Sequence, residues 1–164
     1  MHRVEVSLKP HLPDVRGQGL VKDIGDLGIT SITQARIYDV YYFEGQISQD
    51  KLENISRHVL TDAIIQNFQI GPGCYEPASG NIYSFEVTYN AGVTDPIEES
   101  ILKSIDDLGV TGIASVKTAT RYELAGTPSQ SELDTICSRL LVNPIVQHIV
   151  TSPVTERPKA PEYR

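Results

Sequence analysis

The 164-residue sequence contains no tryptophan, one methionine and two cysteines, and it has no long hydrophobic run. Because a membrane-spanning helix needs about 18 consecutive apolar residues, the sequence predicts no membrane segment. The N-terminal stretch MHRVEVSLKP lacks the apolar region of a signal peptide, and the cysteines lack the spacing of a disulfide framework. We therefore expect a cytoplasmic protein in which Cys137, on an apolar helical face, is buried as a small hydrophobic residue.

Basic residues are fewer than acidic ones. The chain has 14 lysines and arginines against 21 aspartates and glutamates, which gives a formal net charge of −7. A nucleic-acid backbone would be repelled by this charge, and no basic stripe interrupts it. The composition therefore argues against nucleic acid as a partner.

The sequence also lacks the patterns that carry chemistry. None of its four histidines stands at metal-ligand spacing, and neither HExxH nor GxSxG occurs. The GPG at 71–73 lacks the rest of a phosphate-binding loop, and the pair Asp106–Asp107 at a helix end predicts a solvated face. We expect no catalytic, cofactor-binding or metal-binding residue in this chain.

What the sequence does contain is an internal repeat. Residues 4–70 align with residues 85–151 without a gap, and 19 of the 67 pairs are identical. The stretches KDIGDLGIT at 22–30 and KSIDDLGVT at 103–111 show the similarity most clearly. The chain is a tandem duplication, and each copy supports the secondary structure predicted for the other.

The first half of each copy predicts a strand and then a helix. Alternating apolar residues indicate the strand: Val4, Val6 and Leu8 in one copy, and Phe85, Val87 and Tyr89 in the other. Asp14 and Asp95 are expected to accept hydrogen bonds from backbone amides at the start of each helix. Gly28 and Gly109 are expected to end the helices as left-handed caps, and three interior glycines should weaken the first helix.

The second half of each copy predicts a long β segment, a helix and a short strand. The β segments, 32–44 and 113–124, are long enough to be one bent strand or two strands joined by a tight turn. The helices begin at Ser48 and Ser129, and SQSE at 129–132 has the pattern of a capping box. The last strands are expected at 64–70 and 145–150.

These patterns predict an α+β fold with four segments: repeat 1 at 1–70, a linker at 71–82, repeat 2 at 83–151, and a Pro-rich tail at 152–164. A unit of this size would bury only about 60% of its unfolded surface alone, so we expect the two repeats to share a core.

One strand face differs between the copies. The first copy has Tyr38, Val40 and Tyr42 where the second has Ala119, Arg121 and Glu123. Aromatic enrichment on an otherwise polar face suggests contact with a partner protein, so these three residues are the candidate partner contact. The alternative is that this face packs on the second copy within the same chain.

Several motifs resemble the small subunit (PurS) family of phosphoribosylformylglycinamidine synthase. Members of that family carry an Asp-Pro that opens the first helix, a Leu-Gly that ends it, and a Leu-Leu-x-Asn-Pro that closes the second. In this chain the motifs are Asp95–Pro96, Leu108–Gly109 and Leu140–Pro144. The first copy matches more loosely, because no proline follows Asp14 and Thr61–Ala63 replaces Val142–Pro144.

The resemblance implies two β-α-β-β-α repeats whose antiparallel sheets pack against helices, related by a pseudo-twofold axis as a covalent pseudo-dimer. It also implies a non-catalytic role in purine biosynthesis, as a bridge between the glutaminase and the ATP-dependent synthetase of the same complex. That complex uses ATP, Mg and glutamine, none of which this chain is expected to bind itself. Further homo-oligomerisation is left open.

Three alternatives stay open at this stage. The chain could be a free subunit or the N-terminal domain of a longer synthetase, which the reading frame beyond the Arg164 codon would decide. A small-molecule-binding regulatory module would bind a ligand in the cleft between the copies and would melt at a higher temperature with that ligand. An independent enzyme would need converging acid, base or nucleophilic groups, which the sequence does not indicate.

Overall fold

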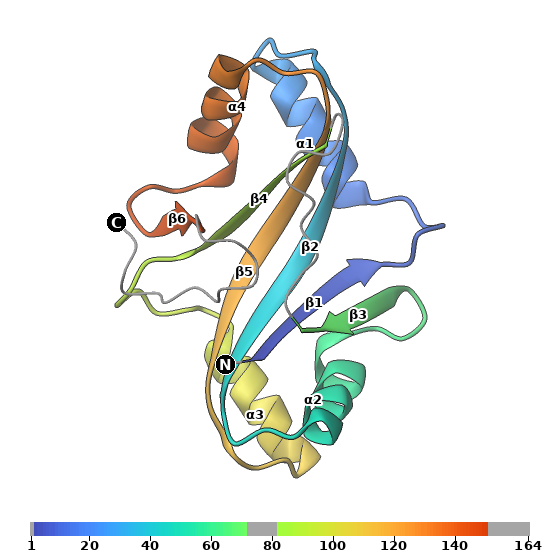
Figure 1. The fold of residues 1–164 in the computed structure, drawn as a ribbon, viewed down its shortest axis with the longest axis vertical. Coiled ribbons are helices and arrows are strands. Elements are labelled where there is room, and N and C mark those ends of the chain that lie inside the picture. Colours follow the sequence, from blue (N-terminus) through green and yellow to red (C-terminus); the bar gives the residue numbers. More distant parts are fainter. Residues whose placement is uncertain (1, 72–81, 151–164) are drawn as a thin grey trace.

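A computed structural model describes residues 2–71 and 82–150, and the two copies have the same element order (Figure 1). The first copy runs through β1 (His2–Leu8), α1 (Val15–Asp26), β2 (Ile32–Gly45), α2 (Gln49–Ile55) and β3 (Gln66–Ile70). The second runs through β4 (Ile82–Tyr89), α3 (Glu98–Leu108), β5 (Ile113–Gly126), α4 (Gln130–Ile136) and β6 (Gln147–Ile149). A π-helical turn extends α2 and α4, at Ser56–Leu60 and Cys137–Leu141.

The strands join both copies into one sheet. Within the described residues this sheet has six strands in the order β3-β1-β2-β5-β4-β6, and every neighbouring pair is antiparallel. The copies meet where β2 pairs with β5 along almost their whole length. In that register Asp39 lies opposite Thr120, which is the residue at the same position of the second copy. The fold is α+β, as the sequence predicts.

The long β segment of each copy is one strand. Both β2 and β5 have 14 residues, and a tight turn inside them would need residues that adopt positive φ. Neither strand contains a glycine before its last residue, Gly45 or Gly126. Each described copy is therefore β-α-β-α-β. The β-α-β-β-α order implied by the resemblance is wrong for this chain.

The predicted glycine and serine caps are confirmed. Gly28 and Gly109 follow α1 and α3 with φ values of 89° and 88°. Ser48 and Ser129 cap α2 and α4, and Glu132 completes the capping box at Ser129. These local signals predicted the ends correctly because each acts through hydrogen bonds within a few residues of the chain.

The hydrophobic core is divided into two clusters, and each combines helices from both copies. In one cluster Leu20 and Ile24 of α1 pack with Leu133 and Ile136 of α4. In the other, helix α2 packs with helix α3, and Figure 1 shows these two helix pairs at opposite ends of the sheet. The expectation of a shared core is confirmed, because neither copy supplies both helices of a cluster.

Among the described residues, no helix combines the length and apolarity needed to cross a lipid bilayer. The predicted linker and tail fall almost entirely outside the described residues, as does Cys74.

Candidate functional site

The candidate partner contact lies on the face of β2 that points away from the helices. Val40 and Tyr42 are buried, with 0% and 4% of their surface exposed, and Tyr38 is half-buried. Val40 pairs across the strands with Ala119 of the second copy, and the two residues form a small apolar cluster with Tyr42. Val40 and Tyr42 therefore pack on the second copy within the same chain, because strand pairing brings that copy against them. Contact of this face with a partner stays a prediction.

A network of buried charges surrounds these residues and connects the two copies. Arg3 of β1 lies 2.9 Å from a carboxylate oxygen of Glu86 in β4. Arg121 of β5 binds Glu5 of β1 through two hydrogen bonds of 2.8 and 3.0 Å. Glu5 and Glu86 occupy the same position in the two copies, so each carboxylate is bound by an arginine from the other copy.

The aromatic residues of β2 complete this network. The Tyr42 hydroxyl donates a hydrogen bond to Glu86 and accepts one from Arg3. The Tyr38 ring lies under the Arg121 guanidinium, 4.0 Å from ring centroid to guanidinium carbon, within the range of a cation–π interaction. The aromatic residues that suggested a partner contact therefore organise arginine–carboxylate pairs inside the chain.

The pKa values in the network favour the charged forms of its ion pairs. Burial alone would raise the pKa of Glu5, but hydrogen bonds and charge from Arg121 and Arg3 outweigh burial and lower it. Burial would lower the pKa of Arg121, and its pairing with Glu5 raises it instead. Burial, with the nearby charge of Glu86, raises the pKa of Tyr42, so its hydroxyl remains a donor at neutral pH. The network can therefore hold the two copies together through its charged pairs.

The paired aspartates tie the first helix of each copy to the long strand. Asp14 accepts hydrogen bonds from the amides of Gly17 and Ile37, both at 2.8 Å. Asp95 accepts from the amides of Ile97, at 3.2 Å, and Thr118, at 2.7 Å. The predicted helix-start role is confirmed for Asp14, whose side chain caps α1. For Asp95 it is confirmed only in part, because this side chain bonds the Ile97 amide just before α3 but does not cap the helix. The bonds to β2 and β5 were missed, although retention in both copies was a signal of a shared role.

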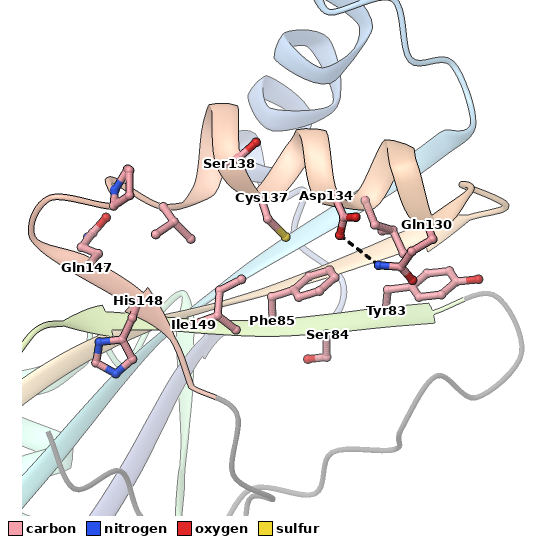
Figure 2. Close-up of a pocket in the computed structure, with 13 residues that line it drawn as sticks. Tyr83, Ser84, Phe85, Gln130, Asp134, Cys137, Ser138, Gln147, His148 and Ile149 are labelled. Carbon is pink, nitrogen blue, oxygen red and sulfur yellow. Dashed lines mark hydrogen bonds between the residues drawn. The ribbon is translucent and has the colours of Figure 1, made fainter. Parts of the chain in front are cut away.

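A pocket of about 880 Å³ lies between helix α4 and strands β4 and β6 (Figure 2). In Figure 2, Tyr83, Phe85 and Ile149 lie beneath the helix and Cys137 faces them from above. Burial raises the pKa of the Cys137 thiol to about 11, so the thiol remains neutral, as its predicted role of small hydrophobic residue requires. No group of three or more His, Cys, Asp or Glu side chains among the described residues could hold a metal ion.

Each copy also presents an exposed isoleucine before its last strand. Ile64 and Ile145 stand at the same position of the two copies and are 81% and 84% exposed. The loops that carry them are built alike: Asp62 accepts a hydrogen bond from the amide of Ile64, and Asn143 accepts one from the amide of Ile145. A large apolar side chain retained at this exposure in both copies is a candidate for contact with another protein.

Comparison with known proteins agrees with the duplication. The family model described as PurS, phosphoribosylformylglycinamidine (FGAM) synthase, matches residues 1–71 and 83–153. The two matches stand in tandem and together cover most of the chain. A comparison with curated proteins gives no match.

Proposed function

Because the chain belongs to the PurS family of phosphoribosylformylglycinamidine synthase, a non-catalytic subunit family of purine biosynthesis, we propose that it couples the glutaminase of that enzyme to its ATP-dependent synthetase. In this proposal the partners carry out the chemistry with glutamine, ATP and Mg, and this chain holds them together so that ammonia passes between their sites. The chain itself binds none of these compounds.

One observation carries the proposal: the duplication places like surfaces at the two edges of one sheet. Strands β3 and β6 stand at opposite ends of the strand order in the described residues. Each is preceded by a loop with an exposed isoleucine, Ile64 or Ile145. A continuous sheet with a similar contact surface at each edge is suited to hold two proteins at a fixed separation.

We also propose that the repeats, at 1–70 and 83–151, are related by a pseudo-twofold axis, so that the chain is a covalent pseudo-dimer. The pairing of Asp39 with Thr120 supports this, because an axis between β2 and β5 would exchange these equivalent positions. The mixed core clusters support it as well, since each contains the first helix of one repeat and the second helix of the other.

Reconstitution tests the coupling role. The synthetase and glutaminase polypeptides are assayed for amidine formation with and without this chain, once with glutamine and once with free ammonia. We expect glutamine-dependent activity to require the chain. Ammonia-dependent activity should be nearly the same with and without it. Glutamine-dependent activity that is unchanged without the chain would show that the coupling proposal is wrong.

The regulatory alternative is less well supported. It requires a ligand site between the two copies, and the pocket lined by Asp39–Tyr41 of one copy and Thr118–Thr120 of the other holds only about 180 Å³. Ligand pockets usually measure about 300–1,000 Å³. The larger pocket beneath α4 is lined by residues of the second copy.

A further inference from the structure

Both repeats contain a pocket at the same place, between the second helix and the last strand. The pocket measures about 880 Å³ in the second repeat and about 350 Å³ in the first. The described residues around the smaller pocket all align with residues around the larger one: Arg57, Thr61, Ala63, Gln66, Asn67 and Phe68 with Ser138, Val142, Pro144, Gln147, His148 and Ile149. The two pockets are therefore one duplicated feature that has diverged.

In the first repeat, a basic side chain that lines the pocket stacks on an aromatic ring of the same pocket. The guanidinium carbon of Arg57 lies 5.6 Å from the centroid of the Phe68 ring, within the range of a cation–π interaction. The second repeat has Ser138 and Ile149 at these positions, so it has neither the arginine nor the aromatic ring beneath it. The second pocket also extends along α4 and β4, where residues such as Leu133 and Phe85 line it.

The second pocket nevertheless has walls that suit an arginine or lysine side chain. Tyr83 and Phe85 of β4 give it aromatic surface, against which the apolar stem of a basic side chain packs well. Asp134 on α4 lines the same pocket and accepts a hydrogen bond of 2.9 Å from Gln130 (Figure 2). A carboxylate beside aromatic rings can bind a guanidinium by hydrogen bonds and by cation–π contact.

The edge of the pocket is held in a fixed shape. Pro144 and Gln147 line the pocket on either side of the exposed Ile145. The Gln147 side chain accepts a hydrogen bond from the Asn143 amide at 2.9 Å, and the Asn143 side chain accepts one from the Ile145 amide at 3.2 Å. Because both bonds close the loop on itself, Ile145 is presented at the pocket edge with little conformational freedom left to lose on binding.

We propose that this pocket of the second repeat receives an arginine or lysine side chain from a partner polypeptide, with Ile145 packing beside it and Asp134 pairing with the charge. The net charge of −7 favours such a basic partner surface. The inference rests on the proposed coupling function and makes it asymmetric. The first repeat, whose pocket is lined by Arg57, docks its partner without this contact.

The test uses the full chain and the synthetase and glutaminase polypeptides of the reconstitution, with each binding affinity measured by titration calorimetry. The variant Ser138→Arg/Ile149→Phe copies the first repeat into the second and should close the pocket. We expect it to weaken binding of one partner by about tenfold or more, as loss of a buried side-chain anchor does, and to leave the other unchanged. The reverse exchange, Arg57→Ser/Phe68→Ile, should leave both affinities within about twofold, as expected of residues outside such an anchor.

A second pair of variants keeps the test decisive if the closed-pocket variant fails to fold. Asp134→Asn should weaken the same partner by about five- to tenfold, because a charge-assisted hydrogen bond is lost, and should reduce the salt dependence of binding. Glu53→Gln, at the same position of the first repeat, should change neither affinity. Thermal melts of all variants show whether each one is folded.

The possible results separate the two proposals. If the unaltered chain binds neither polypeptide, the coupling function is wrong and this inference with it. If it binds both, but the closed-pocket variant and Asp134→Asn bind as tightly as the unaltered chain, this inference alone is overturned. A third result would also overturn this inference alone. That result is faster alkylation of Cys137 after deletion of residues 151–164, measured in a Cys74→Ser background. The pocket would then be covered by the chain's own C-terminal segment and not by a partner.

Discussion

At the scale of single residues, the duplication has kept two carboxylates and changed what binds them. Glu5 and Glu86 stand at the same position of the two repeats, but Arg3 has become Ser84 in the second, and Arg121 replaces Val40 of the first. Each repeat now supplies one arginine to the other repeat's glutamate. A buried ion pair is weak evidence for stability, yet removing one member leaves a buried charge without compensation. The network therefore favours the observed pairing of the two repeats within the one sheet.

The variant Glu5→Gln tests this network. It should lower the free energy of unfolding at pH 7 by about 3 kcal/mol, because Arg121 and Arg3 lose a buried counter-charge. The pKa of Glu5 is lowered in the folded chain from its ordinary value of 4.5 by its bonds to Arg121 and Arg3, so its stabilisation is present above that pH. This stabilisation is lost as the pH falls through the folded-state pKa. The difference between variant and wild type should therefore shrink below about pH 4.5. Urea unfolding at pH 7 and pH 3 measures both quantities.

The matched control is Asp23→Asn, at an exposed position of α1. It should change the free energy of unfolding by less than about 0.5 kcal/mol at either pH, as surface substitutions usually do. An equal loss for both variants, or a Glu5→Gln deficit that stays the same at pH 3, would contradict a stabilising role for the Glu5 carboxylate.

At the scale of elements, helix α1 shows that glycine content alone does not predict whether a helix forms. Three glycines lower its intrinsic propensity, but the helix still forms over 12 residues. Gly17 is buried, and a Cβ atom added there would lie 2.0 Å from the carbonyl oxygen of Ala35 in β2. The absence of a side chain lets α1 approach the strand closely enough for Asp14 to reach the Ile37 amide. Tertiary packing therefore compensates for the weak local propensity.

The variants Gly17→Ala and Gly19→Ala separate these two effects within one helix. Gly17→Ala should destabilise the chain by about 1–3 kcal/mol, because the helix must move away from β2. Gly19 is exposed and has no atom within 4 Å of an added Cβ, so Gly19→Ala should stabilise by about 0.5–1 kcal/mol. Thermal and urea unfolding give both values. Changes of the same sign would show that propensity alone decides the stability of α1.

The sequence predicts the elements of this fold well but not how they pair. Strand alternation, the caps at Gly28 and Gly109 and the box at Ser129 act locally, and two copies of each pattern strengthen the prediction. The partnership of α1 with α4 depends on the pairing of β2 with β5, which joins residues about 80 positions apart and leaves no local signal. For the same reason the sequence leaves open whether Tyr42 contacts a partner or packs inside the chain: Glu86, its hydrogen-bond partner, lies 44 positions away.

At the scale of the whole molecule, neither repeat contains a complete core. The cluster around Ile24 needs α4 and β5 of the second repeat, and the cluster around Ile105 needs α2 and β1 of the first. The fold is therefore one cooperative unit even though its sequence is two similar halves. Separate repeats should fold only by associating.

Cleaving the chain between residues 71 and 82 tests this expectation. The two fragments together should form a complex whose melting temperature rises with concentration, because folding and association are then linked. The melting temperature of the intact chain should not depend on concentration. Circular dichroism melts at several concentrations measure both. A single fragment that unfolds cooperatively at a temperature independent of concentration would show that one repeat suffices to form a core.

The mixed cores also affect how the chain is made. The ribosome adds roughly 5–20 residues per second. Helix α4 begins 115 positions after its partner α1, and helix α3 begins 49 positions after its partner α2. The two partners therefore emerge about 6–23 s and about 2–10 s after the first-repeat helices. During these intervals the apolar faces of α1 and α2 have no helix of the second repeat to cover them. The first repeat is thus a predicted client of ribosome-associated chaperones, and slowing translation within the second repeat should lengthen its exposure to aggregation and proteolysis.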